Sequence, residues 1–208
     1  MIKTQNLLES IKRLLDEKGL AVVPASEEEY LSIAFEYPHR IEYHNSEIIT
    51  MGLASIWHEV IVMTFGTLLN NIFSDNEDVL VMGSNFGVHV PKFEGGYYMP
   101  DVVVVKGEPQ FKGNSTAIVT NPFIIIEVLS PPTTNYDLSE KLGEYKHIES
   151  LNQIVFVSQK KIWVSVYTRS ENPNIWLNQD FEAENDVILI DNQSIVVRDI
   201  YKKVKFEN

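Results

Sequence analysis

A single carboxylate inside an apolar run constrains this chain more than any other feature. Glu127 lies within residues 123–129, where every other side chain is apolar and most are β-branched. Such a run is typical of a strand that is covered on both faces. A buried carboxylate is costly unless it is paired or binds a metal ion. The fold must therefore bring a partner to Glu127.

The overall composition is that of an ordinary soluble globular protein. The chain has 208 residues, of which 44% are hydrophobic and 22% charged, so we expect one domain over residues 1–208. No apolar run is long enough to span a membrane, and the first residues lack the pattern of a signal peptide. The absence of cysteine excludes disulfides and thiolate metal sites, and it fits a cytoplasmic location.

The net charge of -12 argues against general, sequence-independent attraction to nucleic acid. The net charge does not exclude a local basic groove. The same charge suits an enzyme that recruits divalent cations through carboxylates.

Hydrophobic periodicity predicts helices and strands in alternating blocks. Helices are expected over residues 7–18, 53–73 and 134–149, the first ended by Gly19 and the last begun by a capping pair of Thr134 and Asp137. The apolar stripe of the second helix consists of Ala54, Ile61, Phe65, Leu68 and Ile72. Strands are expected at 40–43, 47–51, 79–81, 86–90, 101–105, 123–129, 154–157, 162–167, near 176 and at 187–190. This order predicts an α/β domain in which a central mixed sheet is flanked by helices.

Two carboxylates stand at the ends of neighbouring predicted strands. Asp101 follows Pro100 at the start of a valine-rich strand, and Glu127 lies near the end of the next long strand. If these strands are neighbours in the sheet, the two side chains converge at one edge. Two close carboxylates repel each other and favour a hard cation such as Mg²⁺ between them.

Further polar residues lie on the adjacent helices. Asp137, Lys141 and Tyr145 are spaced by four and project from one helix face, so Lys141 is able to point towards Glu127. His58 falls on the apolar stripe of the long helix.

Each of these residues also has a purely structural interpretation. Asp101 can cap a turn, the helix triplet can be a solvated face, and a lone core histidine such as His58 is usually not a ligand. Glu127 can form a structural ion pair with Lys141 or an arginine. The ordered set is more specific than any of its members.

The ordered motifs resemble those of the Uma-two family of restriction-endonuclease-like proteins, which belongs to the PD-(D/E)XK nuclease-like superfamily. The resemblance is carried by residues 100–105, by residues 125–133, and by Asp137, Glu140, Lys141 and Tyr145. It also covers residues 41–51, His58 and Tyr167, and so extends from about residue 30 to about residue 170.

The resemblance implies a restriction-endonuclease-like core and a metal-dependent phosphodiesterase site. Asp101, Glu127 and the backbone carbonyl of Val128 would hold Mg²⁺, with Mn²⁺ as a substitute. The lysine that the superfamily places two residues after the glutamate is replaced by Leu129. Lys141 is its expected substitute.

The remaining site residues have supporting roles by the same resemblance. His58 takes a helix position at which superfamily members often carry an acidic residue, and we expect it to contact the metal or its water. Asp137 would orient Lys141, whereas Tyr145 is assigned to packing near the site.

The resulting hypothesis is a Mg²⁺-dependent endonuclease that hydrolyses DNA phosphodiester bonds, with a homodimer as a possible state. Two alternatives stay open: a binding or regulatory module that has lost catalysis, and a metal-dependent hydrolase of a small phosphate ester or nucleotide. A positive groove leading to Glu127 would favour DNA. Its candidate cations are Lys92, Lys106, Lys112, Lys160 and Lys161.

Overall fold

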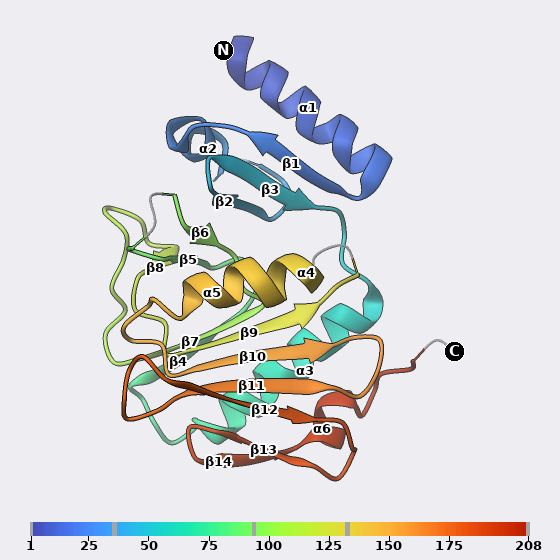
Figure 1. The fold of residues 1–208 in the computed structure, drawn as a ribbon, viewed down its shortest axis with the longest axis vertical. Coiled ribbons are helices and arrows are strands. Elements are labelled where there is room, and N and C mark those ends of the chain that lie inside the picture. Colours follow the sequence, from blue (N-terminus) through green and yellow to red (C-terminus); the bar gives the residue numbers. More distant parts are fainter. Residues whose placement is uncertain (1, 35–36, 93–94, 132–133, 207–208) are drawn as a thin grey trace.

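A computed structural model describes residues 2–34, 37–92, 95–131 and 134–206 (Figure 1). The described residues form two six-stranded sheets and a separate two-stranded ribbon. The mixed α/β class predicted from the sequence is confirmed. The second large sheet was not anticipated. Pro132 and Thr133, which belong to the family-like motif, lie outside the described residues.

The sheet that carries Glu127 is mixed and has the strand order β12-β11-β10-β9-β7-β4. Strands β9 and β10 run parallel, and the other neighbours are antiparallel. The bounds of its strands are β4 (Val79–Met82), β7 (Val102–Lys106), β9 (Ile124–Leu129), β10 (Gln153–Ser158), β11 (Val164–Arg169) and β12 (Trp176–Phe181).

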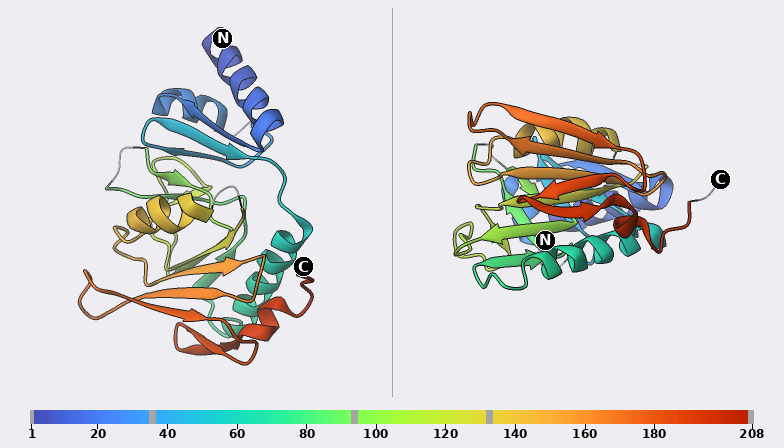
Figure 2. Two further views of the ribbon diagram at one scale, coloured as in Figure 1. Left: turned by 45° about the vertical axis from the view of Figure 1, so that its right-hand side comes forward. Right: turned by 90° about the horizontal axis from the view of Figure 1, so that it is seen from below.

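Helices cover both faces of this sheet (Figures 1 and 2). On one face lie α3 (Ile56–Ile72), α6 (Val197–Tyr201) and the ribbon of β13 (Val187–Ile190) and β14 (Gln193–Val196). On the other face lies a continuous helical segment that consists of α4 (Thr134–Tyr136), the π-helix η1 (Asp137–Lys141) and α5 (Leu142–Tyr145). This double cover explains why every residue of β9 is buried.

The N-terminal sheet has the strand order β1-β3-β2-β6-β5-β8 and lies beside α1 and α2 (Figure 1). Apolar side chains of both helices pack with its strands in one cluster. Its strands are β1 (Leu20–Pro24), β2 (Ile41–His44), β3 (Glu47–Met51), β5 (Gly87–His89), β6 (Tyr97–Tyr98) and β8 (Ile118–Val119). The two helices are α1 (Ile2–Lys18) and α2 (Glu27–Ala34).

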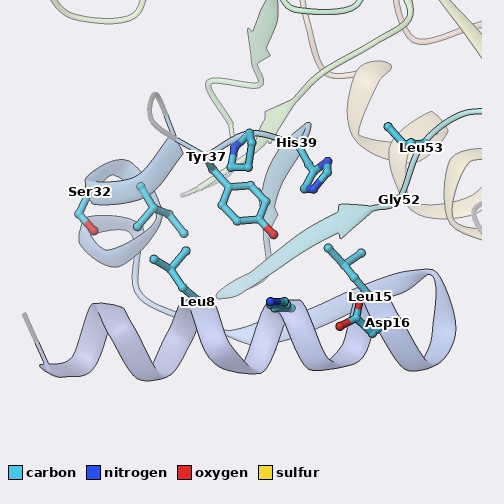
Figure 3. Close-up of a pocket in the computed structure, with 11 residues that line it drawn as sticks. Leu8, Leu15, Asp16, Ser32, Tyr37, His39, Gly52 and Leu53 are labelled. Atoms are coloured by element: carbon cyan, nitrogen blue, oxygen red, sulfur yellow. The ribbon is translucent and has the colours of Figure 1, made fainter.

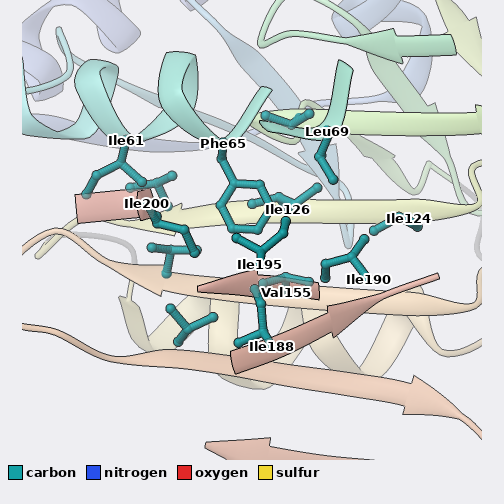
Figure 4. Packing of buried hydrophobic residues seen from close by; sticks show 14 of the residues in the cluster. Ile61, Phe65, Leu69, Ile124, Ile126, Val155, Ile188, Ile190, Ile195 and Ile200 are labelled. Atoms are coloured by element: carbon teal, nitrogen blue, oxygen red, sulfur yellow. The ribbon is translucent and has the colours of Figure 1, made fainter. Parts of the chain in front are cut away.

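The buried face of α3 packs against β9 and β10 (Figure 4). Its fully buried apolar side chains are Ile61, Phe65 and Leu69, which meet Ile126 and Val155 from the strands. Burying a side chain of this size contributes about 1.5–3 kcal/mol, so this contact is a main source of stability.

The predicted stripe of α3 was partly wrong. Ala54 precedes the helix and is exposed, whereas Leu68 and Ile72 are only half-buried. Ser55 begins the helix by accepting a hydrogen bond from the amide of His58. The buried face of the helix includes Leu69 rather than Leu68 or Ile72. His58 lies on that buried face, as predicted.

The predicted helix over residues 134–149 is shorter and less regular than expected. The capping pair was wrong because the Thr134 hydroxyl donates to the Ser130 carbonyl and Asp137 pairs with Lys141. The helical segment ends at Tyr145. After it the amide of Ile148 bonds only three residues back, and this tighter turn directs Ile148 into the core.

The helical segment also joins the two sheets. His44 of β2 lies with Nδ1 2.9 Å from Glu144 Oε1, and Tyr98 of β6 donates a hydrogen bond of 2.6 Å to Glu144 Oε2. Both His44 and Glu144 are buried. The segment that carries Lys141 thus packs on the sheet of Glu127 and is also held by side chains of the N-terminal sheet. Among the described residues, no helix has the length and apolarity that crossing a membrane requires.

Candidate active site

Asp101 and Glu127 lie at the same end of two paired strands. Strand β7 pairs with β9 in an antiparallel register that sets Val102 opposite Ile126, so the condition under which the two carboxylates converge is met. The side chain of Asp101, just before β7, accepts a hydrogen bond of 2.7 Å from the Val128 amide. Because the N–H and C=O of a strand residue lie on the same edge, the Val128 carbonyl shares the edge of Asp101.

Two cationic or ionisable side chains meet Asp101. Arg40 Nη1 lies 2.5 Å from Asp101 Oδ1, and His58 Nε2 lies 3.3 Å from Asp101 Oδ2. Arg40 precedes β2 of the N-terminal sheet, whereas His58 comes from α3. Asp101 is itself only 2% exposed. The two sheets therefore meet at this carboxylate.

Glu127 receives two donors on one oxygen. Lys141 Nζ lies 3.2 Å from Glu127 Oε1, and the Tyr145 hydroxyl donates to the same atom at 2.7 Å. Leu129, two residues further along β9, packs with the apolar residues on this face instead of contributing a charge. Tyr145, assigned to packing, is thus also a hydrogen-bond donor to Glu127.

Lys141 connects three carboxylates. Its Nζ lies 2.9 Å from Glu42 Oε1 and 3.1 Å from Asp137 Oδ1, in addition to its contact with Glu127. Glu42 Oε1 also accepts the Met99 amide, whereas Glu42 Oε2 is buried without a hydrogen-bond partner among the described residues. A buried orphan oxygen of this kind is costly, and it is chemically suited to a cation.

The local helix geometry explains how Lys141 reaches these groups. Residues Asp137–Lys141 form a π-helix, in which hydrogen bonds run to the fifth residue instead of the fourth. The amide of Leu142 accordingly bonds to the Asp137 carbonyl. Both Asp137 and Lys141 are buried by this turn, and π-helical turns are frequent at functional sites.

The environment holds Asp101 ionised. Burial alone would raise the pKa of the Asp101 carboxyl, but the charge of Arg40 and the hydrogen bonds from His58 and Val128 outweigh burial and hold it well below its usual range. Burial would also lower the pKa of His58, yet the hydrogen bond to Asp101 and its charge raise it above the usual value. His58 is therefore poised to carry a proton beside Asp101.

Glu127 behaves in the opposite way. Burial is the largest effect and raises the pKa of Glu127 to about 8, with Asp137, Asp101 and Glu42 adding to the rise and Lys141 opposing it. Burial also works against the charge of Lys141, but the surrounding carboxylates raise the pKa of Lys141 well above its usual value. The lysine thus stays charged in the interior.

A wide cleft borders the site. It has a volume of about 1440 Å³, and its walls include Arg40 and His58 together with Ser84, Pro131 and Lys160. A second cavity of about 660 Å³ lies between α1, Tyr37 and His39 (Figure 3). Neither cavity is lined by Asp101 or Glu127, but Arg40 and His58, which both contact Asp101, line the wider cleft, so this cleft is the one that borders the carboxylates.

Most of the lysines that would form a positive groove do not line this cleft. Of the five candidate lysines only Lys160 lines the cleft. Lys106 pairs with Asp191, and Lys161 lies 3.6 Å from Glu182. The positive charge nearest to the carboxylates comes from Arg40 and Lys141 instead.

The donor chemistry fits a hard divalent cation. Asp101, Glu127 and Glu42 supply carboxylate oxygens, which Mg²⁺ prefers together with water. Among the described residues, no group of three or more His, Asp or Glu is arranged as a complete metal cage. Sites for Mg²⁺ usually contain one or two protein carboxylates, and waters complete the coordination.

Sequence reasoning missed Arg40 and Glu42. Glu42 stands in the strand Ile41–His44, all of which is buried, so it carries the same signal as Glu127: a charge inside a buried strand. Arg40 gives no such local signal, because its partner Asp101 lies in another sheet. The structure brings Asp101, Glu127, Lys141, His58, Asp137 and Tyr145 together as the sequence motifs predicted. Their roles in chemistry stay predictions.

Sheet, helices and acidic site together define a protein of the restriction-endonuclease-like class. The family model described as "Uma2: Putative restriction endonuclease" matches residues 27–193. The chain therefore belongs to the Uma2 family, as its motifs predicted.

Relatives and a solved structure agree with this assignment. Two Synechocystis proteins, "Uncharacterized protein sll1609" and "Uncharacterized protein slr1290", are each 30% identical to this chain. The first match covers 76% of this chain and 87% of the relative, and the second covers 77% and 82%. The crystal structure of "a putative nuclease belonging to DUF820" from Anabaena variabilis superposes with a TM-score of 0.69. It is 17% identical and covers 86% of this chain and 98% of its own, so it supports the fold.

Proposed function

We propose that this protein is a Mg²⁺-dependent endonuclease that hydrolyses DNA phosphodiester bonds. The observation that carries the proposal is the meeting of Asp101 and Glu127 at one sheet edge, with Lys141 Nζ 3.2 Å from Glu127 Oε1. Carboxylates with a nearby lysine are the parts that metal-assisted phosphodiester hydrolysis requires. Membership of a family described as restriction endonucleases supports the choice of substrate.

The residues that would hold the metal are Asp101, Glu127 and the carbonyl of Val128. We add Glu42, because its Oε2 is buried beside Lys141 without a partner among the described residues. When bound, Mg²⁺ would supply an activated water and neutralise charge on the phosphate.

The neighbouring side chains would position these ligands. Lys141 keeps a positive charge beside Glu127 and would stabilise negative charge that develops on the phosphate. His58 Nε2 contacts Asp101 Oδ2 and would exchange a proton with water bound at the site. Asp137 orients Lys141, and the Tyr145 hydroxyl orients Glu127.

A cleavage assay tests the proposal. Supercoiled plasmid, single-stranded DNA and RNA are each incubated with the protein and Mg²⁺, Mn²⁺ or EDTA. We expect nicking of DNA with either metal and none in EDTA. The matched control is Glu127→Gln, which keeps the side-chain shape and should lower the rate by about a hundredfold or more. Equal cleavage by Glu127→Gln, or cleavage in EDTA, would contradict the proposal.

A second candidate is a hydrolase of small phosphate esters or nucleotides. It is favoured by the net charge of -12 and by a cleft to which, of the five candidate lysines, only Lys160 contributes. Turnover of bis-p-nitrophenyl phosphate and nucleotides without plasmid nicking would favour this candidate. Mn²⁺ binding with no turnover of any substrate would favour the third reading, a module that has lost catalysis.

A homodimer is consistent with cleavage of both DNA strands by two copies of one site. Sedimentation equilibrium at micromolar protein, with and without a DNA duplex, measures the oligomeric state. A linear plasmid product from a strict monomer would contradict the dimer.

A further inference from the structure

Arg40 occupies the side of Asp101 that faces the cleft. Its Nη1 lies 2.5 Å from Asp101 Oδ1, and Nη2 donates to the Met99 carbonyl. Arg40 lines the cleft, and its side chain is 23% exposed, whereas that of Asp101 is 2% exposed. The guanidinium therefore lies between the carboxylate and the open cleft.

The contacts of Asp101 divide between its two oxygens. Oδ2 accepts a hydrogen bond from the Val128 amide and lies 3.3 Å from His58 Nε2. Oδ1 contacts Arg40. Oδ2 is already contacted by two groups that stay in place, so an ion that binds Asp101 through Oδ1 must replace Arg40 there.

We propose that Arg40 is a resident cation that a divalent metal displaces from Asp101, and that the freed guanidinium then binds a phosphate oxygen of the substrate. The inference rests on the proposed function and deepens it, because it names the residue that couples metal loading to substrate binding.

The local structure permits this exchange. The Arg40 backbone is fixed by a hydrogen bond of 2.5 Å from the Thr50 hydroxyl to the Arg40 carbonyl, so the side chain can move while the strand stays in place. Asp101 keeps the Val128 amide and His58 after the exchange. The exchange keeps a positive charge at Oδ1, because the metal takes the place of the guanidinium, and the added positive charge of the loaded site favours an anionic phosphate.

The freed guanidinium suits a phosphate. Arg40 Nε is already buried without a hydrogen-bond partner among the described residues, and release from Asp101 leaves Nη1 unpaired as well. A guanidinium with adjacent free N–H groups matches the bidentate geometry of phosphate oxygens. Arg40 is, moreover, one of the few cations that line the cleft.

Metal binding in the absence of substrate tests the first half. Mn²⁺ is titrated into the full chain and followed by calorimetry and by electron paramagnetic resonance. We expect Arg40→Met to bind Mn²⁺ at least tenfold more tightly than the unsubstituted chain, because no cation competes for Asp101. An equal or weaker affinity would overturn the inference.

A matched control removes a cation that is paired with an aspartate elsewhere. Lys106→Met breaks an ion pair of 3.2 Å with Asp191 and should change Mn²⁺ affinity less than twofold. If Arg40→Met does not fold without metal, Mn²⁺ should restore its circular dichroism, and Arg40→Met with Asp101→Asn should fold without metal. Failure of both rescues would overturn the inference.

Phosphate binding tests the second half. With Mn²⁺ at saturation, inorganic phosphate should bind the unsubstituted chain at least tenfold more tightly than Arg40→Met. Equal phosphate affinities would overturn this half.

The outcomes separate this inference from the proposed function. Tighter Mn²⁺ binding by Arg40→Met in a protein that never cleaves DNA would support the inference and overturn the nuclease. DNA cleavage by the unsubstituted chain, together with an Mn²⁺ affinity that is unchanged in Arg40→Met, would support the nuclease and overturn the inference. Absence of Mn²⁺ binding by both proteins would overturn the metal site and the inference together.

Discussion

Lys141 Nζ lies 3.2 Å from Glu127 Oε1, although the lysine belongs to a helix and the glutamate to a buried strand. Leu129, at the strand position where the resemblance leads us to expect a lysine, packs into the core. The positive charge therefore reaches the glutamate from the neighbouring layer. Lys141 of the helical segment thus provides the charge that Leu129 of β9 does not carry.

Removing Lys141 should destabilise the fold strongly. Lys141→Met leaves Glu42, Glu127 and Asp137 without their shared cation, and breaking a buried pair on one side costs about 3–5 kcal/mol. Urea unfolding in EDTA measures the loss. The exposed pair of Lys106 and Asp191 provides the control, since Lys106→Met should cost less than about 1 kcal/mol. Equal losses for the two variants would contradict the buried network.

Lys141 should also matter more for turnover than for metal binding. In Lys141→Arg the charge remains but the ammonium is replaced by a planar group that cannot point at three carboxylates from one atom. We expect Mn²⁺ affinity within about threefold of the unsubstituted chain and cleavage at least about a hundredfold slower. Loss of metal binding with normal turnover per bound metal would contradict this role.

Glu42→Gln tests the carboxylate that sequence reasoning missed. Glutamine retains an acceptor for Lys141 and for the Met99 amide, so we expect the free energy of unfolding to change by about 1 kcal/mol or less. It loses the charge at the buried, unpartnered oxygen. Mn²⁺ affinity should therefore fall at least about tenfold. Calorimetry that finds the same affinity in both proteins would remove Glu42 from the ligand set.

The shifted pKa of Glu127 predicts an unusual pH dependence of stability. Its pKa is raised to about 8 by burial and by neighbouring carboxylates, so the folded state holds a proton that the unfolded state releases near pH 4.5. The protonated Glu127 carboxyl therefore stabilises the folded state below pH 4.5, and this contribution to the free energy of unfolding is lost as pH rises through 8. In EDTA, the difference in unfolding free energy between the unsubstituted chain and Glu127→Gln should fall by up to about 1.4 kcal/mol per pH unit in this window. Parallel stability curves would contradict the shift.

His89 should sensitise the protein to acid. Burial and the charge of Lys112 lower the pKa of His89 to about 4 against a weaker opposing effect of Glu27. The folded state therefore resists protonation, and stability is lost as pH falls from 6.5 to 4. His89→Phe retains the edge-to-face ring contact with Tyr97, whose centroid lies 4.7 Å away. The variant should lose about 1–2 kcal/mol less stability over this range, measured by urea unfolding at each pH. An unchanged loss would contradict the assignment.

Local patterns predicted much of the fold. Helix α3 was predicted from the apolar repeat of its one buried face, and strands β7, β9 and β10 were predicted from apolar runs that are almost completely buried. Strands β6 and β8 were not predicted, since two-residue strands leave no periodicity. Their existence depends on pairing with residues far away in the chain, and such pairing has no local signature.

The same distinction holds for the site. Glu127 and Lys141 were predicted because a charge in an apolar strand and a lysine on the next helix are visible within one stretch of sequence. The contact of Arg40 with Asp101 joins residues 61 positions apart, from two sheets. No pattern near Arg40 indicates that contact, so the cation that covers the carboxylate emerged only from the folded structure.

The π-helical turn at Asp137–Lys141 makes the site sensitive to chain length as well as to side-chain chemistry. A π turn accommodates one more residue than an α turn of the same length. Deleting a single residue between Asp137 and Lys141 would restore α-helical spacing and rotate the lysine by about 100° around the helix axis. A relative could therefore keep every motif residue and still lose its lysine from the site. An insertion or deletion in this turn, rather than a substitution, would be the simplest change with that effect.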